Sequence, residues 1–295
     1  MPNVKLKNYL HLHFLVFIAG FTAILGELIT IQAIPLVWYR MTIAGILIFI
    51  FLRYKRIKLS IPLNVKIRFF LAGVVIALHW ITFFAAINTS NISVTLAMFS
   101  TGAFFTSLIE PLFYRRRIIL YEIVFGLLVI LGVAMIMQIE GEYFYGIILG
   151  ILSAFLSSLF AVMNGKFVQN YNPLTISFYE FISGILFISI FLVFDHEHGF
   201  SSSFFNITSR DFIYLLILAS VCTAYAFIAS VYVMKYITPF SVVLTYNLEP
   251  VYGMIMAFII FPDKEKMPII FYIGSSLIIF TVLLNAIIKY IKNKN

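Results

Sequence analysis

Long apolar runs, separated by short polar or proline-containing breaks, follow one another along the whole chain. A membrane span needs roughly 20 mostly apolar residues to cross about 30 Å of hydrocarbon at 1.5 Å per residue. The breaks contain turn and helix-ending residues, such as Pro62, Pro173 and Pro239. By these criteria the pattern predicts ten membrane-spanning helices, at residues 11–30, 35–52, 68–88, 92–113, 119–138, 145–166, 174–194, 211–235, 239–261 and 267–288.

Composition agrees with this pattern and excludes several classes of protein. Of the 295 residues, 62% are hydrophobic and 11% are charged, against roughly 45–50% and 25% in soluble domains. A bilayer removes the need for a polar shell, so the chain is predicted to be an all-α membrane protein. The connections are too short for a soluble domain, and no nucleotide-binding GxxxxGK[ST] loop occurs, which excludes ATP-driven pumping. One cysteine, Cys222, excludes an internal disulfide framework.

The charged residues predict the orientation of the spans. With the ten spans above, 16 of the 20 lysine and arginine residues fall on the side that holds both termini. Most acidic residues fall on the opposite side. The positive-inside rule therefore predicts cytoplasmic termini in a multi-pass protein of the cell membrane. Because the cations lie in short clusters between apolar runs, membrane orientation explains the net charge of +8 better than nucleic-acid binding does.

Two pairs of predicted spans are similar to each other. Val37-Trp38-Tyr39-Arg40 corresponds to Ser177-Phe178-Tyr179-Glu180, and Ser93-Val94-Thr95-Leu96 corresponds to Ser241-Val242-Val243-Leu244. Chance similarity between apolar helices is the alternative explanation. Because five is an odd number of spans, a repeated half of five spans begins on the opposite side of the membrane and must be inverted relative to the first half. The prediction is therefore two inverted five-helix repeats, residues 1–140 and 141–295, around a central cavity near the membrane midplane.

The chain resembles the drug/metabolite transporter superfamily, in its ten-span EamA-type branch. The resemblance is carried by Val37–Arg40, by Trp80 with Phe83-Phe84-Ala85-Ala86, by Ser93-Val94 with Gly102, and by Ser241-Val242 with Leu248-Glu249-Pro250-Val251. It implies transport of small metabolites such as amino acids, usually export, through a cavity lined by the first, third, fourth, sixth, eighth and ninth spans. The chain departs from the family pattern at Thr101-Gly102, where a proline is typical, and at the acidic Glu249.

Ionisable residues within spans are costly unless they have a partner or face water, so they are candidates for the site. Glu249 lies near mid-depth, and Pro250 after it removes a backbone donor, which predicts a helix kink near Tyr246 and Asn247. Glu249 is predicted to bind an amino group or a coupling proton. The alternative is a structural carboxyl group that is bonded to a neighbouring helix.

Further candidates lie in the second, third and fourth spans. His79 and Trp80 lie near mid-depth, with His79 either a hydrogen-bonding group of the cavity or a structural imidazole. Arg40 is predicted either to bind a substrate carboxylate or to pair with Glu27. Thr101 offers a small polar group in the fourth span.

The remaining ionisable residues of interest are Glu180, Glu110 and two pairs of histidines. Glu180, the repeat counterpart of Arg40, has Lys166 as its predicted partner, and Glu110 is expected to be structural. The pairs His11/His13 and His196/His198 lack further ligands, so no metal site and no cofactor are predicted.

The prediction from the sequence is a non-enzymatic secondary transporter of small polar metabolites that works by alternating access. Its predicted partners are the solute, the lipid bilayer and a coupling proton, with no nucleic acid. A membrane-embedded transferase would need a clustered acid/base or metal site near an interface. A non-transporting membrane subunit would leave the ionisable groups at mid-depth unexplained.

Overall fold

The described chain consists of helices joined by short connections. The computed structural model describes residues 2–57, 59–115, 117, 124–125, 128–129, 131–132, 135, 143–194, 199–200, 202–237, 239–246 and 248–292. The helices in these ranges are α1 (Pro2–Leu28), α2 (Ala33–Tyr54), α3 (Leu63–Thr89), α4 (Ile92–Phe99), α5 (Gly102–Tyr114), α7 (Phe144–Phe167), α8 (Pro173–Phe194), α9 (Ser202–Phe205), α10 (Ser209–Ala219), the π-helix η2 (Ser220–Tyr225), α11 (Ala226–Val233), α12 (Pro239–Tyr246), α13 (Glu249–Ile260) and α14 (Ile269–Lys292).

Nine of the ten predicted spans coincide with one helix or with successive helices of the described chain. The span predicted at 119–138 lies largely outside the described residues. Within the described part, seven helical segments are long and apolar enough to cross a bilayer, and α13 and the first part of α14 are shorter apolar helices. The prediction of an all-helical, multi-pass membrane protein is therefore confirmed.

Capping side chains and prolines determine where several helices begin. The Asn91 side chain accepts a hydrogen bond of 2.8 Å from the backbone nitrogen of Val94 at the start of α4. Thr208 caps α10 in the same way. These bonds satisfy amide groups that have no partner within the first helical turn. Pro173 and Pro239 are the first residues of α8 and α12, where the missing N–H group is tolerated.

Two predicted spans are interrupted near their middle. The fourth span breaks at Ser100-Thr101 between α4 and α5, where both hydroxyl groups donate to backbone carbonyls three residues earlier. The ninth span breaks between Tyr246 and Glu249, and Pro250 lies in the first turn of α13. The predicted kink is confirmed as a break between two helices.

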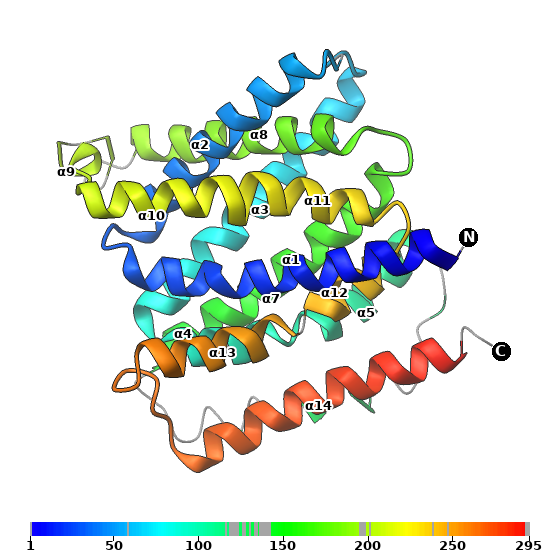
Figure 1. Ribbon diagram of the computed structural model, residues 1–295, viewed down its shortest axis with the longest axis vertical. Helices are drawn as coiled ribbons and strands as arrows, with labels where there is room; N and C mark the ends of the chain where they lie inside the picture. Colours follow the sequence, from blue (N-terminus) through cyan, green and yellow to red (C-terminus); the bar gives the residue numbers. More distant parts are fainter. Residues whose placement is uncertain are drawn as a thin grey trace.

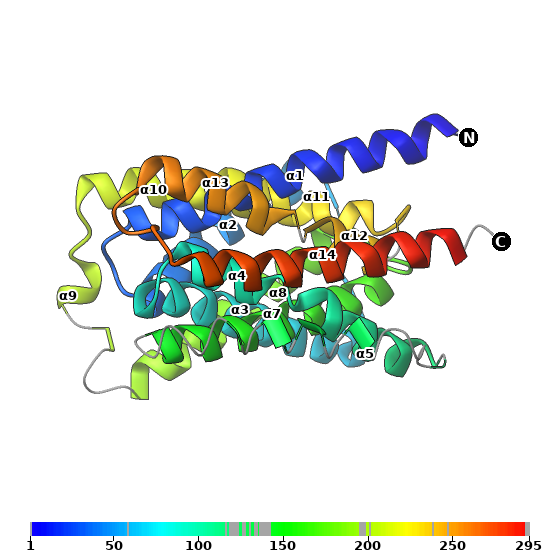
Figure 2. The same cartoon turned by 90° about the horizontal axis from the view of Figure 1, so that it is seen from below.

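Helices from the two parts of the chain pack against each other in matching pairs. Helix α3 packs on α7, and in the matching pair α1 packs on α10 and α11. Helix α3 also packs on α8, and in the matching pair α2 packs on α10 and η2. The packing of α4 and α5 on α7 is likewise matched by α1 on α12 and α13. Figures 1 and 2 show the long helices side by side, with the N- and C-terminal ends at the same end of the bundle.

Two arginines adopt a left-handed backbone conformation where a helix ends. Arg56, after α2, and Arg115, after α5, both have φ of 52°. A left-handed conformation costs a residue with a side chain about 1–2 kcal/mol, so glycine is the usual residue at such positions. At the end of α2 the backbone amides of Arg56 and Ile57 donate to the carbonyl oxygens of Arg53 and Leu52, and these bonds close the last helical turn.

Candidate functional site

A cavity of about 150 Å³ lies among the helices. A single water molecule needs roughly 10–15 Å³, so the space admits several waters or a small solute. All six spans that are expected to line a cavity contribute to its walls, through α1, α3, α4, α5, α7, η2, α11, α12 and α13. Helix α2 also contributes. Of the seven candidate residues, Arg40, His79, Trp80, Tyr246 and Glu249 line it.

Arg40 enters the cavity from α2 and is held by two neighbouring elements. Its Nε donates to Thr223 Oγ1 at 2.6 Å, and its guanidinium carbon lies 4.0 Å from the centroid of the Trp80 ring. Only 2% of Arg40 is exposed, and its Nη1 has no acceptor among the described residues. A desolvated cation over an aromatic face gains about 2 kcal/mol. The side chain is thus oriented but retains one nitrogen able to bind an anionic group.

The π-helix η2 presents the hydroxyl group that orients Arg40. Thr223 Oγ1 donates to the carbonyl of Leu218, five residues earlier, at 2.6 Å. The oxygen is therefore free to accept from Arg40. The carbonyl of Cys222 lies 3.5 Å from Arg40 Nη2. Widened turns of this kind recur at functional sites because they redirect backbone and side-chain groups.

Glu249 supplies the opposite charge from the first turn of α13. It is 5% exposed, lines the cavity, and accepts no hydrogen bond from any described residue. Arg40 lines the same cavity. A helix N-terminus favours a carboxylate because its first amide groups carry partial positive charge. The cavity therefore contains a cationic and an anionic group on different helices.

Tyr246 and His79 add oriented polar groups. Tyr246 lies 2.6 Å from Ser230, whose hydroxyl also donates to the carbonyl of Ala226, so the Tyr246 hydroxyl is the donor to Ser230. His79 Nδ1 lies 3.0 Å from the carbonyl oxygen of Ser153. The Ser153 hydroxyl, 2.9 Å from Nδ1, donates to the carbonyl of His79 at 3.2 Å. A carbonyl only accepts, so Nδ1 donates to Ser153 and carries a proton, and in the neutral ring the lone pair then lies on Nε2.

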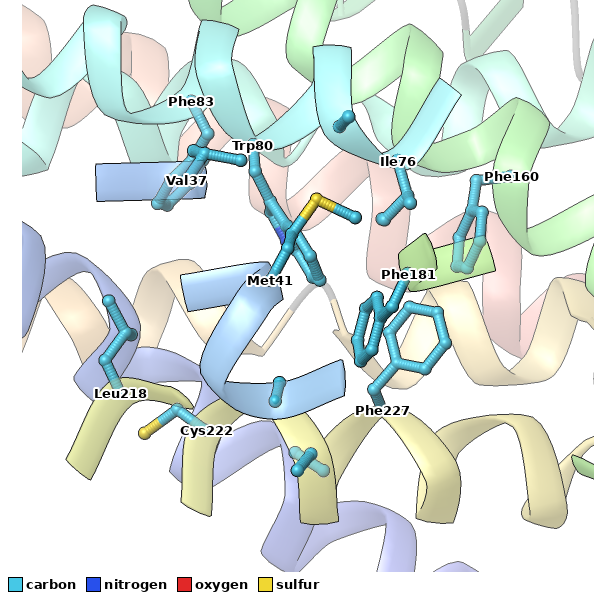
Figure 3. Packing of buried hydrophobic residues seen from close by; sticks show 14 of the residues in the cluster. Val37, Met41, Ile76, Trp80, Phe83, Phe160, Phe181, Leu218, Cys222 and Phe227 are labelled. Atoms are coloured by element: carbon cyan, nitrogen blue, oxygen red, sulfur yellow. The ribbon is translucent and has the colours of Figure 1, made fainter. Parts of the chain in front are cut away.

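Aromatic rings form the apolar wall of the cavity. Phe227 of α11 lies 4.7 Å from Phe181 of α8, 5.3 Å from Phe160 of α7 and 6.0 Å from Trp80 of α3, measured between ring centroids. Figure 3 shows the rings of Phe181 and Phe227 lying together, with Trp80 nearby. Four helices thus meet at one aromatic cluster, and Phe227, Phe160 and Trp80 of this cluster line the cavity.

Of the other two candidates, Thr101 does not line the cavity, and Asn247 cannot be placed. Thr101 lies at the break between α4 and α5, and its hydroxyl donates to the carbonyl of Met98 at 2.7 Å. Its neighbour Gly102 lines the cavity instead. Asn247 lies outside the described residues.

Two predicted ion pairs are wrong. Glu27 pairs with Lys264 at 2.7 Å rather than with Arg40, because Arg40 points inward to Trp80 and Thr223. Glu180 accepts from Asn164 Nδ2 at 2.9 Å rather than from Lys166. Asn164 is fully buried beside Glu180, whereas the Lys166 ammonium group lies over the rings of Phe113 and Tyr114.

The eighth span, which is expected to line the cavity, contributes residues that are not among the candidates from the sequence. Cys222, Ser230 and Phe227 line the cavity, and Thr223 holds Arg40. None of these residues is charged, so a search for ionisable groups at mid-depth passes over them. The signal available was the run of small and polar residues at 220–224 in an otherwise apolar span.

Carboxylates at the end of the bundle opposite the termini join several helices. Asp211 at the start of α10 accepts two hydrogen bonds of 2.8 Å from Thr30, in the connection after α1. The buried Glu265 accepts from the backbone nitrogens of Ile92 and Ser93 at 3.0 and 2.8 Å. Together with the pair of Glu27 and Lys264, these bonds link the ends of α1, α4, α10 and α13 on this side of the cavity.

Comparisons with known proteins identify the family. A solved structure described only as a crystal structure of a protein is 12% identical, covers 94% of this chain and 96% of its own, and superposes with a TM-score of 0.67. This similarity shows a shared fold. No curated protein matches the chain. The model of the EamA-like transporter family matches residues 7–138 and, a second time, residues 144–287. The chain therefore belongs to the EamA-like transporter family.

Proposed function

We propose that the protein is a secondary transporter that exports small zwitterionic metabolites, such as amino acids, by alternating access. The observation that carries the proposal is the cavity that contains both Arg40 and Glu249. A carboxylate would bind the unpaired nitrogen of Arg40, and an ammonium group would bind Glu249. Apolar residues of the cavity wall, Phe227 and Phe160 among them, would contact the apolar side chain of such a solute.

Alternating access requires two halves that can exchange conformations. The proposed halves are residues 1–140 and 141–295, arranged as inverted five-helix repeats, ten spans in all. Support comes from the two family matches, from the matching helix pairs, and from the breaks in the fourth and ninth spans. When the similar segments of these two spans are aligned, Gly102 corresponds to Pro250. The second helix of each span begins at nearly the same aligned position, α5 at Gly102 and α13 one residue before Pro250.

The proposed location is the cell membrane, with both termini in the cytoplasm. The asymmetric distribution of lysine and arginine supports this orientation. Glu249 and the lone pair of His79 are the proposed sites for a coupling proton, because both groups line the cavity and bind protons reversibly. Export would then be driven by exchange of the solute for protons.

Solute flux in proteoliposomes tests the proposal. Radiolabelled amino acids, tested individually, should exchange across membranes that contain the parent protein. Glu249→Gln keeps the size of the side chain but removes its charge. Loss of one hydrogen bond to a charged group, worth about 1.5–3 kcal/mol, predicts a decrease in flux of roughly 10- to 150-fold.

Asp263→Asn is the matched control, because Asp263 is an exposed acid in the connection after α13. This control should transport like the parent, and both variants should unfold thermally like the parent. Flux of Glu249→Gln equal to that of the parent for every transported amino acid would refute the assigned role of Glu249. Absence of amino-acid flux in the parent would refute the proposed substrate class.

A further inference from the structure

A second hollow lies at the end of α2, away from the cavity. It measures about 570 Å³ and is lined by Phe49, Leu52, Arg53, Arg56, Ile57, Leu59 and Ser60. Two guanidinium groups and a hydroxyl group form its polar part, and the other four residues are apolar. The hollow thus combines an anion-binding edge with an apolar wall, on the side of the membrane to which the chain termini belong.

The arginines of the hollow have no neutralising partner among the residues that the structure describes. Residues 53–68 contain six lysines and arginines and no acidic residue. Neither Arg53 nor Arg56 forms an ion pair with a described residue, and both side chains are exposed. Such a concentration of positive charge at a membrane surface attracts anionic lipid headgroups. Arginine suits a phosphate in particular, because its planar group donates two parallel hydrogen bonds.

The backbone holds Arg56 in the hollow in a strained conformation. Its φ of 52° is one that glycine adopts without strain, yet the position carries a long charged side chain. Backbone strain of this kind is typical of functional positions. The connection that follows is also held in place, because the Tyr179 hydroxyl of α8 donates to the carbonyl of Leu59 at 2.7 Å. The hollow is therefore formed by the end of α2 and by a connection that is bonded to α8.

We propose that this hollow binds the phosphate group of an anionic phospholipid, with Arg53 and Arg56 as its ligands. A lipid fits better than a free phosphate ion because Phe49, which is 43% exposed on the surface of α2, continues the hollow as an apolar path for the acyl chains. Lipid bound here would hold the end of α2, the helix that carries Arg40, to the connection that follows it. The proposal does not depend on which solute the cavity accepts.

Thermal unfolding of the full chain tests the proposal in vesicles of phosphatidylcholine with and without phosphatidylglycerol. The anionic lipid should raise the melting temperature of the parent, and inorganic phosphate in phosphatidylcholine vesicles should not. Arg53→Gln should weaken lipid binding about fivefold, the change that corresponds to about 1 kcal/mol for one basic group at an anionic surface. Arg68→Gln, an exposed cation of the same cluster outside the hollow, should leave most of the shift intact.

Arg56→Gly gives a sharper test because its two expected effects have opposite signs. Glycine relieves the left-handed strain, so the variant should melt higher than the parent in phosphatidylcholine alone, yet its response to anionic lipid should fall. Arg115→Gly is the matched control, since Arg115 has the same φ of 52° but lies outside the hollow. It should gain stability and keep the lipid response.

Three results would overturn the proposal. If Arg53→Gln and Arg56→Gly respond to phosphatidylglycerol as the parent does, the hollow is not the site. Equal losses for Arg68→Gln and Arg53→Gln would indicate diffuse attraction of the basic cluster. A full shift with inorganic phosphate would indicate a free anion as the ligand.

Discussion

Gly73 of α3 lies against the backbone of α8, and its replacement by alanine tests the packing between these helices. A Cβ atom at Gly73 would overlap with the carbonyl oxygen of Glu180 and would lie 2.7 Å from Cβ of Ser183. The Glu180 oxygen is a backbone atom, and the Ser183 Cβ is bonded directly to the backbone. Neither atom can therefore move away as the end of a flexible side chain would. Overpacking of this kind costs about 1–3 kcal/mol.

Gly45→Ala is the matched control for Gly73→Ala. Gly45 of α2 also faces α8, but its added Cβ would lie 3.5 Å from Ile185 and 3.8 Å from Phe181, which are ordinary contact distances. Each variant gains about 1 kcal/mol from the higher helix propensity of alanine. The free energy of unfolding should therefore be lower for Gly73→Ala than for Gly45→Ala by about 1–3 kcal/mol, the overpacking cost itself.

Equilibrium unfolding of the purified protein in mixed detergent and dodecyl sulfate micelles measures this difference. Helix content followed by circular dichroism reports the transition. If Gly73→Ala were as stable as Gly45→Ala, α3 and α8 would not be in backbone contact. The enclosure of the cavity by helices from both parts of the chain would then be wrong.

Three further predictions concern polar contacts of the bundle. Glu265→Ala leaves two buried amide groups at the start of α4 without an acceptor and should lower the free energy of unfolding by about 2–4 kcal/mol, measured in the same micelles. Thr223→Val removes the acceptor of Arg40 Nε and should cost about 1.5–3 kcal/mol and reduce flux, whereas Thr223→Ser should preserve both. The hydrogen bond to Glu27 raises the pKa of Lys264, so its stabilisation is present below the usual lysine pKa of about 10.4 and is lost as the pH rises through the raised value. Because Lys264 is 69% exposed, the effect should stay below about 1 kcal/mol, and thermal melts against pH should show the alkaline loss in the parent but not in Glu27→Gln.

Depth within the membrane could be predicted from the sequence because it depends only on position along a helix. The apolar runs predict ten spans, nine of which coincide with helices of the described chain, and Pro250 predicts the break before α13. Arg40, His79 and Glu249 were selected by their depth, and all three line the cavity. Each of these inferences uses the rise of 1.5 Å per residue and the chemistry of a single side chain.

Lateral partners could not be predicted in this way, because they depend on how each helix is rotated about its axis. Arg40 and Thr223 are 183 residues apart, and Glu27 and Lys264 are 237 residues apart. Lys166 seemed a suitable partner for Glu180 by charge and depth, but Asn164 is the residue of α7 that faces it. The widened turn of η2 has no proline or glycine to mark it, so the hydroxyl that orients Arg40 was missed.

The central claim, that one cavity opens to each side of the membrane in turn, can be tested with the native cysteine. Cys222 is the single cysteine of the chain and lines the cavity. A membrane-impermeant thiol reagent should label it from either face, in right-side-out and in inside-out vesicles, with a transported amino acid slowing the reaction from both faces. Cys222→Ser should not be labelled, and Ser157→Cys in that background should repeat the parent pattern from a second wall of the cavity. Labelling of both reporters from one face only, or from neither face, would contradict alternating access.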